Sequence, residues 1–428
     1  MNRQMRGFII FSILLTNAFL SEVANGDHPV REIPVTGKSI ETLAGLDDAI
    51  LGLIDKHDLP GISIAISENG RLIHSRGYGY ANRDAAEAVL PSSRFRIASI
   101  SKPITAVAIL RLVDLGKLQL DDRVFDILDA PESVENSPPP DRRLKDVTIK
   151  HLLQHRGGWD RDKSFDPMFR SVHWAQLCNC EPPAMPKEVI RGMQSQPLDF
   201  DPGKQYAYSN YGYCLLGRVI EKLSGQDYDV FVQTQIFQPL DIKSITLGKT
   251  RLAGRQANEV QYYHPGEGKS VFAGDLDQFV PIPYGTWCLE AMDAHGGWIA
   301  TAEDLVRFID AIGLEPKAAK DKLSWVLRPE TIGSMLLRPD GEQGDKDSYY
   351  GLGFTIRPGK DGFHTVWHNG SLPGTSTELT RRSDGRSFAV LINSRHSVGG
   401  TNPLNDVTRA IHRALAELGE SSVVSIPQ

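Results

Sequence analysis

The stretch Phe95-Arg96-Ile97-Ala98-Ser99-Ile100-Ser101-Lys102-Pro103-Ile104-Thr105 places a hydroxyl and an amine three residues apart where a helix is expected to begin. Proline is tolerated in a helix only within the first turn, because it lacks a backbone N–H and its ring clashes with the preceding turn. Pro103 therefore predicts a helix that starts just before it. Residues three apart share a helix face, so the Lys102 amine can reach the Ser99 hydroxyl, and the free N–H groups of the first turn point to the same place. These are the parts of an activated nucleophile.

The residues that follow this stretch indicate burial. From Ile104 to Leu115 the sequence is apolar nearly all round, as in a helix that is buried on most sides, and Gly116 is a typical C-terminal stop. Burial lowers the pKa of a lysine towards neutrality, and a neutral lysine can take the proton of a serine. Taken alone, however, Ser-x-x-Lys also describes a serine N-cap followed by a solvated lysine. The rest of the chain has to separate these two interpretations.

Composition narrows the class of protein. The chain has 428 residues, enough for two domains or one large elaborated domain. Forty-seven basic and fifty-three acidic residues give a net charge of -6 without a basic stripe, so we expect no nucleic-acid partner. The twelve histidines are scattered and show no Cys/His spacing typical of a metal site, so we expect neither a metal nor another cofactor. The oligomeric state cannot be predicted from this sequence.

The first 26 residues have the pattern of a secretory signal peptide. Basic Arg3 and Arg6 precede an apolar run from Phe8 to Leu20, and Ala24 and Gly26 are spaced like a cleavage site. The apolar run is short for a membrane span, so we expect no stable membrane span and a secreted or periplasmic protein. In an oxidising compartment the four cysteines can pair, and one bridge from Cys178 or Cys180 to Cys288 is compatible with the spacing, which does not settle the pairing of these residues or of Cys214.

Hydrophobic periodicity indicates a sheet interrupted by a long insertion. Residues 40–54 repeat with helical period, and residues 61–67 and 71–80 alternate as strands around the turn Asn69-Gly70. Further strands are expected at residues 351–356, 365–369, 376–381 and 387–393, and a closing helix at 402–418. We therefore predict an α+β fold in which residues 40–117 and 349–420 form an antiparallel sheet flanked by helices. Residues 118–348 would form an inserted domain of helices and loops, with no strand alternation from Trp159 to Pro202, and residues 27–428 together would form one catalytic unit.

Two further clusters combine groups suited to proton transfer and substrate binding. In Tyr206-Ala207-Tyr208-Ser209-Asn210-Tyr211-Gly212, Tyr208 and Asn210 would project to one side of an extended loop. A phenol can pass a proton to a leaving group, and an amide can hold both a lysine and a substrate carbonyl. In Val366-Trp367-His368-Asn369-Gly370-Ser371, His368 could donate to a substrate carboxylate or to Tyr208, and Gly370 could let a substrate backbone approach the strand. The Ser371 N–H could join that of Ser99 in an oxyanion hole.

The three clusters, taken in order, resemble the active-site motifs of the serine hydrolases related to class C β-lactamases, D-Ala-D-Ala carboxypeptidases, D-aminopeptidases and β-lactamase-type carboxylesterases. Ser-x-x-Lys is matched by Ser99 and Lys102, Tyr-x-Asn by Tyr208 and Asn210, and the Lys/His-x-Gly strand motif by His368 and Gly370. Supporting segments also look familiar, at residues 148–155, 236–240, 296–298 and 350–354. The resemblance extends over almost all the chain after residue 26 and implies a β-lactamase/transpeptidase-like fold.

By this resemblance Ser99 forms an acyl-enzyme, and Lys102 and Tyr208 share proton transfer in a division of labour that sequence does not show. Asn210 would orient Lys102 and the substrate, His368 and Gly370 would bind substrate, and Ser371 would supply an oxyanion donor. Two departures stand out. His368 replaces the lysine of class C β-lactamases, which argues against efficient β-lactam hydrolysis, and the segment His155-Arg156-Gly157-Gly158-Trp159 lies where Thr-Ser-Gly is commoner in the family.

The resemblance implies an exported serine hydrolase acting on a small amide or ester, such as a D-amino-acid peptide, with cell-wall-derived peptides among the substrates to be considered. A carboxylesterase is the first alternative, with an acyl pocket made by aromatic residues at positions 262, 263, 272, 279, 284 and 287, although ordinary core packing explains most of these rings as well. The second alternative is a penicillin-binding protein that is acylated but turns over little.

Overall fold

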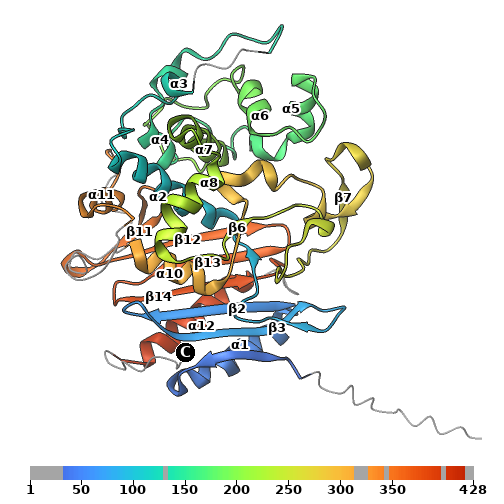
Figure 1. Ribbon diagram of the computed structural model, residues 1–428, viewed down its shortest axis with the longest axis vertical. Helices are drawn as coiled ribbons and strands as arrows, with labels where there is room; N and C mark the ends of the chain where they lie inside the picture. The colour runs from blue at the N-terminus through green and yellow to red at the C-terminus, as the bar shows by residue number, and fades with distance from the viewer. Residues whose placement is uncertain (1–31, 129–133, 313–325, 342–346, 397–401, 420–428) are drawn as a thin grey trace, which may run out of the picture. The chain divides into compact units, whose positions relative to one another are not determined.

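A nine-stranded antiparallel sheet forms the base of the molecule (Figure 1). The computed structural model describes residues 32–128, 134–312, 326–341, 347–396 and 402–419, so the predicted signal peptide lies outside the described residues. The strand order is β1 (Val35–Ser39), β3 (Arg71–Asn82), β2 (Gly61–Glu68), β14 (Arg386–Ile392), β13 (Thr375–Arg381), β12 (His364–Leu372), β11 (Thr355–Pro358) and β10 (Tyr349–Tyr350), with the short β4 (Glu87–Ala88) beside β3. The two ends of the chain thus meet where β2 pairs with β14.

The alternation of β2 explains why helices cover both faces of the sheet. Ile62, Ile64 and Ile66 are fully buried against α1 (Ala44–His57) and α12 (Pro403–Glu417). Ala65 points the other way, into a second core that includes α2 (Ser101–Asp114), α7 (Asn210–Ser224) and α10 (Ala302–Ile312). A period of two places successive side chains on opposite faces, so each strand contributes to two hydrophobic layers.

The remaining helices lie above the second face of the sheet, in the part of the chain between β5 (Phe95–Arg96) and β10 (Figure 1). They are short: α3 (Val124–Ile127), α4 (Ile149–Leu153), α5 (Ser171–Cys178), α6 (Pro186–Met193), α8 (Tyr228–Val232), α9 (Asp293–Gly296) and α11 (Pro329–Met335). Single helical turns η1 to η10 and η12 connect many of these elements. None of the helices that the structure describes is both long and apolar enough to cross a membrane.

The predicted α+β architecture is confirmed, with corrections in detail. The segment between β10 and β11 is a turn rather than a strand, because Gly351 and Gly353 leave the strand path and Gly353 adopts φ +92°. The described part of the insertion is mainly helical and contains short strands outside residues 159–202. β9 (Trp298–Ala300) pairs with both β5 and β6 (Thr246–Leu247), and β7 (Glu267–Lys269) pairs with β8 (Phe279–Pro281). The boundaries proposed for a separate inserted domain remain a prediction.

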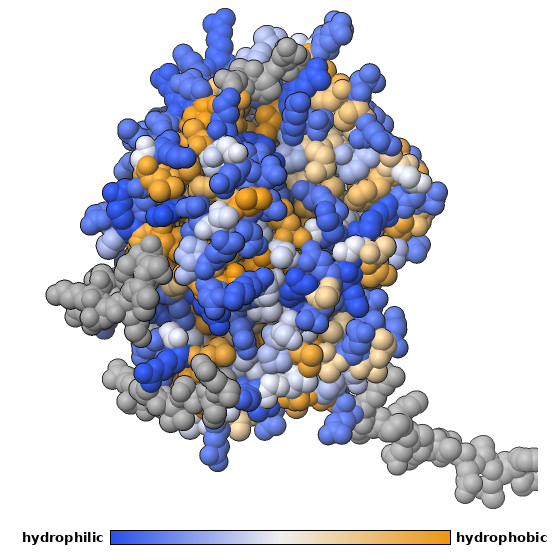
Figure 2. Space-filling model, in the orientation of Figure 1, coloured by the Kyte–Doolittle hydropathy of each residue, from blue (hydrophilic) through white to orange (hydrophobic). Residues whose placement is uncertain are grey.

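The surface of the molecule is mixed in polarity. On the face in Figure 2 hydrophobic side chains are scattered among hydrophilic ones. Isolated exposed apolar residues are normal for a folded protein and indicate no partner by themselves.

Candidate active site

Ser99 lies in a single helical turn, η2 (Ala98–Ile100), that leads directly into α2. Pro103 falls within the first turn of α2, as predicted, and nearly the whole helix is buried. Ala98, the residue before Ser99, adopts φ +49°, a left-handed conformation that costs a non-glycine residue on the order of 1 kcal/mol. The tight turn at Ala98 presents Ser99 to a cavity while Lys102 points into the protein.

The Lys102 amine is completely buried and has three polar neighbours. Its Nζ lies 3.1 Å from Ser99 Oγ, 2.8 Å from Asn210 Oδ1 and 2.9 Å from the backbone carbonyl oxygen of His295. The two carbonyl oxygens can only accept, so each takes an N–H of Lys102. Burial lowers the pKa of Lys102 well below its ordinary value. A neutral Lys102 would therefore direct its lone pair at the hydroxyl of Ser99, as a general base requires.

Tyr208 lies against the same two residues. Its hydroxyl shares a hydrogen bond with that of Ser99, and Lys102 Nζ lies 4.8 Å from the centre of its ring. Burial raises the pKa of Tyr208, so the phenol keeps its proton at neutral pH. Asn210 is the first residue of α7 and follows the N-cap Ser209, so the extended loop predicted for Tyr208 and Asn210 is wrong at its second half. Both side chains nevertheless reach Lys102 or Ser99.

Asp166 is a member of this network that sequence reasoning missed. Its Oδ2 accepts a 2.5 Å hydrogen bond from Asn210 Nδ2, which fixes the amide so that its oxygen faces Lys102. Its other oxygen caps a short helical turn by accepting a hydrogen bond from the Met168 N–H. The sequence signal for Asp166 is the pair Asp166-Pro167, which is typical of the start of any helix. The Asp166 charge raises the pKa of Lys102, against the larger lowering effect of burial.

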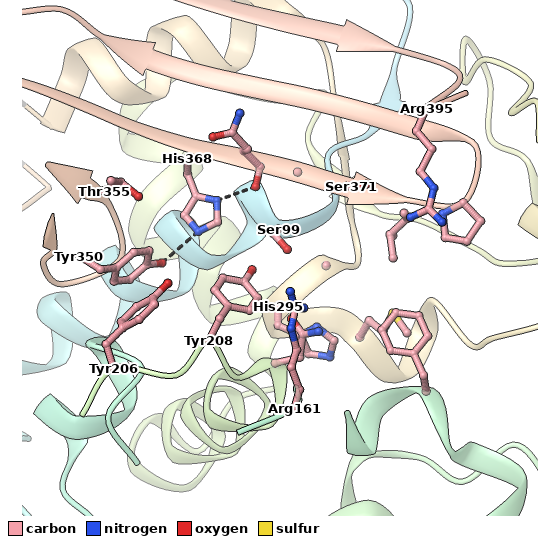
Figure 3. A pocket seen from close by; sticks show the side chains of 18 residues that line it. Ser99, Arg161, Tyr206, Tyr208, His295, Tyr350, Thr355, His368, Ser371 and Arg395 are labelled. Carbon is pink, nitrogen blue, oxygen red and sulfur yellow. Dashed lines mark hydrogen bonds between the residues drawn. The ribbon is translucent and has the colours of Figure 1, made fainter. Parts of the chain in front are cut away.

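Arg161 was also not predicted. Arg161 is exposed, and its guanidinium lies 4.7 Å from the centre of the Tyr208 ring (Figure 3). Its positive charge further lowers the pKa of Lys102. Asp166 and Arg161 therefore act on the amine in opposite directions.

His368 lies on β12 but does not have the role expected of it. Its Nδ1 is 2.7 Å from the Asn369 carbonyl oxygen, which can only accept, and its Nε2 is 3.0 Å from the Tyr350 hydroxyl. Burial lowers the pKa of His368 to about 3, so the ring is neutral and its Nε2 accepts from Tyr350. Both nitrogens are thus engaged, and the ring centre stands 6.5 Å from that of Tyr208. The predicted donation from His368 to a substrate carboxylate or to Tyr208 does not fit this arrangement.

Gly370 is required by packing rather than by substrate approach. A Cβ at this position would lie 2.3 Å from the Ile97 carbonyl oxygen and 2.2 Å from Thr377 Oγ1. The missing side chain therefore lets β12 pack against the segment that carries the nucleophile. Ser371, one residue further, lines the cavity together with Ser99. Because β11 pairs with β12 only as far as Trp367, the described residues leave one edge of β12 open beside Ser99.

His155, part of the segment that departs from the usual family sequence, holds the Tyr208 loop. Its Nδ1 accepts from the Ser209 N–H at 3.1 Å, and its carbonyl oxygen accepts from the Ala207 N–H at 2.9 Å. Its ring centre lies 4.3 Å from that of Tyr208. His155 thus restrains the residue on either side of Tyr208, and Tyr208 itself.

These residues surround a cavity of about 620 Å³. Besides Ser99, Tyr208, Asn210, His368, Gly370 and Ser371, the described lining residues are Arg161, Phe169, Tyr206, Met292, His295, Gly296, Tyr350, Thr355, Asn369, Leu372, Pro373 and Arg395. None of the six aromatic residues proposed for an acyl pocket is among them. Tyr262, Tyr284 and Trp287 instead surround the buried Arg96 guanidinium, at 4.2, 5.5 and 5.4 Å from their ring centres, so that prediction is wrong.

The described residues contain neither a cluster of metal-ligating side chains nor a disulfide. Over the described ranges, no group of three or more histidine, cysteine or acidic side chains could hold a metal ion. All four cysteines are free thiols, so the bridge considered between Cys178 or Cys180 and Cys288 is not formed.

Comparison with known proteins identifies the family of this chain. A family model described as Beta-lactamase matches residues 46–412. The chain belongs to this family. Penicillin-binding protein 4* of Bacillus subtilis is 26% identical over 346 residues, which cover 80% of this chain and 69% of that protein. The mitochondrial serine beta-lactamase-like protein LACTB of Homo sapiens is 26% identical over 401 residues, covering 78% and 70%.

Solved structures agree with the fold of the beta-lactamase family. The octameric penicillin-binding protein homologue from Pyrococcus abyssi superposes with a TM-score of 0.65 at 25% identity, covering 88% of this chain and 79% of that one. The D-amino acid amidase from Ochrobactrum anthropi SV3 superposes with a TM-score of 0.62 at 21% identity, covering 88% and 99%, and shows the fold alone. The resemblance stated from the three motifs is thereby confirmed.

Proposed function

We propose that this protein is an exported hydrolase that cleaves a small amide or ester through an acyl-enzyme on Ser99. The observation that carries the proposal is the burial of Lys102 with its amine 3.1 Å from Ser99 Oγ and its other two contacts taken by carbonyl oxygens. A structural lysine would gain nothing from this position, because burying an ammonium is strongly unfavourable unless it is paired. A neutral lysine that acts as a base avoids this cost, so the position suits a catalytic role.

The geometry favours a division of labour between Lys102 and Tyr208 that the sequence leaves open. Lys102 would accept the Ser99 proton as Oγ attacks the carbonyl carbon. Tyr208, whose pKa is raised by burial, would deliver its proton to the leaving group and would be reprotonated by the proton that Lys102 took from Ser99. The N–H groups of Ser99 and Ser371 would hold the oxyanion, and losing one such donor typically slows a reaction by about 10²- to 10³-fold. Water would then release the acyl group by the reverse sequence.

We propose a D-amino-acid peptide or a similar compound as the substrate class, cell-wall-derived peptides included. The similarity to a penicillin-binding protein supports this choice. A penicillin-binding protein with little turnover is the second candidate, supported by the same relative. The carboxylesterase alternative loses its structural argument, since the aromatic residues that suggested it do not line the cavity.

Export is proposed on the sequence of the first 26 residues alone. N-terminal sequencing of the protein recovered from the periplasm or culture medium would test it. A mature chain beginning near residue 27 is expected, and a chain retained in the cytoplasm with residue 1 intact would contradict export.

Mass spectrometry tests the acyl-enzyme directly. The mature protein would be incubated with benzylpenicillin and, separately, with p-nitrophenyl acetate, with Ser99→Ala as the control. We expect an adduct on the wild type and none on the variant, because the acyl group is carried by Ser99 Oγ. A short-lived adduct indicates a hydrolase, and a persistent one indicates a penicillin-binding protein with little turnover. If the folded wild type forms no adduct with either probe, the proposed function is wrong.

A further inference from the structure

The residues that line the cavity include two arginines, although the protein has a net negative charge. The described lining includes Arg161 and Arg395 and no aspartate or glutamate, whereas the whole chain carries a net charge of -6. A cleft of one sign in a protein of the other raises the local concentration of oppositely charged ligands. The cavity is therefore suited to a substrate that carries a negative charge.

Arg395 is the cation available for such a charge. Within the part of the chain that the structure describes, its guanidinium has no hydrogen-bond or ion-pair partner, and it lines the cavity from the segment after β14. Arg161, by comparison, lies over the Tyr208 ring and 3.8 Å from Asp162. His368 is neutral, with both ring nitrogens engaged.

The position of Arg395 places it on the acyl side of the bond that is cleaved in the proposed reaction. Figure 3 shows Tyr206, Tyr350, Thr355 and His368 on one side of Ser99 and Arg395 on the other, beyond Ser371. In the proposed reaction Tyr208 protonates the leaving group, so the leaving group departs on the side of the tyrosines. The acyl portion would then extend along the open edge of β12 towards Arg395.

The lining of the cavity that holds Ser99 and Arg395 includes apolar side chains. Leu372 and Pro373 follow Ser371 on the chain, and Phe169 and Met292 line the same cavity. Such side chains suit a hydrocarbon stem better than a polar chain. A carboxylate at the far end of that stem would find the planar, always charged fork of an arginine, which matches carboxylate geometry.

We propose that Arg395 forms an acyl-side subsite for a carboxylate, so that the preferred substrates are amides or esters whose acyl portion ends in a negative charge. This inference rests on the proposed function, because it assumes turnover at Ser99. It places the charge on the part of the substrate that becomes attached to Ser99, and not on the leaving group.

Matched esters with one leaving group test the subsite. The probes are p-nitrophenyl monoesters of straight-chain dicarboxylic acids, from succinate to suberate, each compared with the p-nitrophenyl ester of the monocarboxylic acid of the same length. Release of p-nitrophenol would be followed for wild type, Arg395→Gln and Arg395→Lys, and the rate with Ser99→Ala would be subtracted to remove spontaneous hydrolysis. Arg413→Gln, which removes an exposed arginine on α12 beneath the opposite face of the sheet, is the control for net charge.

We expect the wild type to prefer the carboxylate ester over its neutral partner at one or more chain lengths. Arg395→Gln should reduce kcat/KM for that ester by about 10-fold or more through KM, the range typical of a hydrogen-bonded charge, and leave the neutral ester unchanged. Arg395→Lys should retain part of the preference, Arg413→Gln all of it, and added salt should weaken it because Arg395 is exposed.

Two different failures can be told apart. If wild type hydrolyses the neutral esters in a Ser99-dependent manner but shows no carboxylate preference at any length, or if Arg395→Gln changes both ester types equally, the subsite is wrong and the proposed function stands. If no ester of either type is hydrolysed in a Ser99-dependent manner and Ser99 forms no adduct, the proposed function itself is wrong.

Discussion

Asp166 and Arg161 should shift the pH dependence of the reaction in opposite directions. In the proposed mechanism the reaction requires neutral Lys102, so kcat/KM is expected to rise with pH as the amine loses its proton. The negative charge of Asp166 favours the ammonium and the positive charge of Arg161 disfavours it. Asp166→Asn should therefore move the acid limb of the profile to lower pH, and Arg161→Gln should move it to higher pH.

The size of the Asp166 effect follows from the hydrogen-bond path between the two charges. Lys102 Nζ to Asn210 Oδ1 is 2.8 Å and Asn210 Nδ2 to Asp166 Oδ2 is 2.5 Å. With the width of the amide between them, the charges are at most about 8 Å apart, which at an effective dielectric constant of about 20 gives an interaction of about 2 kcal/mol. Asp166 is half-buried, so solvent screening reduces this value. We expect kcat/KM on the acid limb, relative to the plateau, to increase about 10-fold in Asp166→Asn.

The assay is Ser99-dependent hydrolysis of a neutral ester, measured as kcat/KM against pH at constant ionic strength. Asp166→Asn keeps an oxygen that can accept from Asn210, so the shape of the site is preserved while its charge changes. Asp48→Asn, an exposed aspartate on α1, is the matched control and should leave the profile in place. A shift of both active-site variants in the same direction, or a shift of Asp166→Asn to higher pH, would refute Lys102 as the titrating base.

Three further predictions concern packing, stability and thiols. Gly370→Ala should lower the free energy of unfolding by about 1–3 kcal/mol in urea titrations, because its Cβ would lie 2.3 Å from a backbone oxygen. Gly52→Ala, on α1, has open space around its Cβ and should be neutral or stabilising. Equal effects of the two substitutions would contradict the packing argument. Burial lowers the pKa of His74 to about 3, so the unfolded chain binds a proton that the folded chain does not, and stability should fall as pH decreases from about 6.5 towards 3, by up to about 1.4 kcal/mol per pH unit. His74→Asn should flatten that slope, and an unchanged slope would show that other groups cause it. Iodoacetamide should label the exposed Cys180 in the native protein and spare the buried Cys214, as mass spectrometry of digests would show; rapid labelling of Cys214 would mean that α7 opens readily.

The sequence by itself predicted the main helices and strands and Ser99 as the candidate nucleophile. Pro103 located the start of the helix, and the apolar run after it predicted the burial that the structure shows for α2. The alternation of residues 61–67 and 71–80 predicted β2 and β3, since a half-buried or buried strand must repeat with period two. Local patterns of this kind are visible because each involves residues that are neighbours in the chain.

Only the tertiary structure decided how the groups around Ser99 are charged and connected. Asp166 reaches Lys102 through Asn210, and Tyr350 takes the free nitrogen of His368. Both pairs are brought together by packing between segments far apart in sequence, and no periodic pattern in the sequence predicts such contacts. Burial is likewise a property of the folded chain, and it lowers the pKa values of Lys102 and His368. The motifs thus identified the candidate reacting residues, and the fold decided which groups surround them and in which direction their pKa values shift.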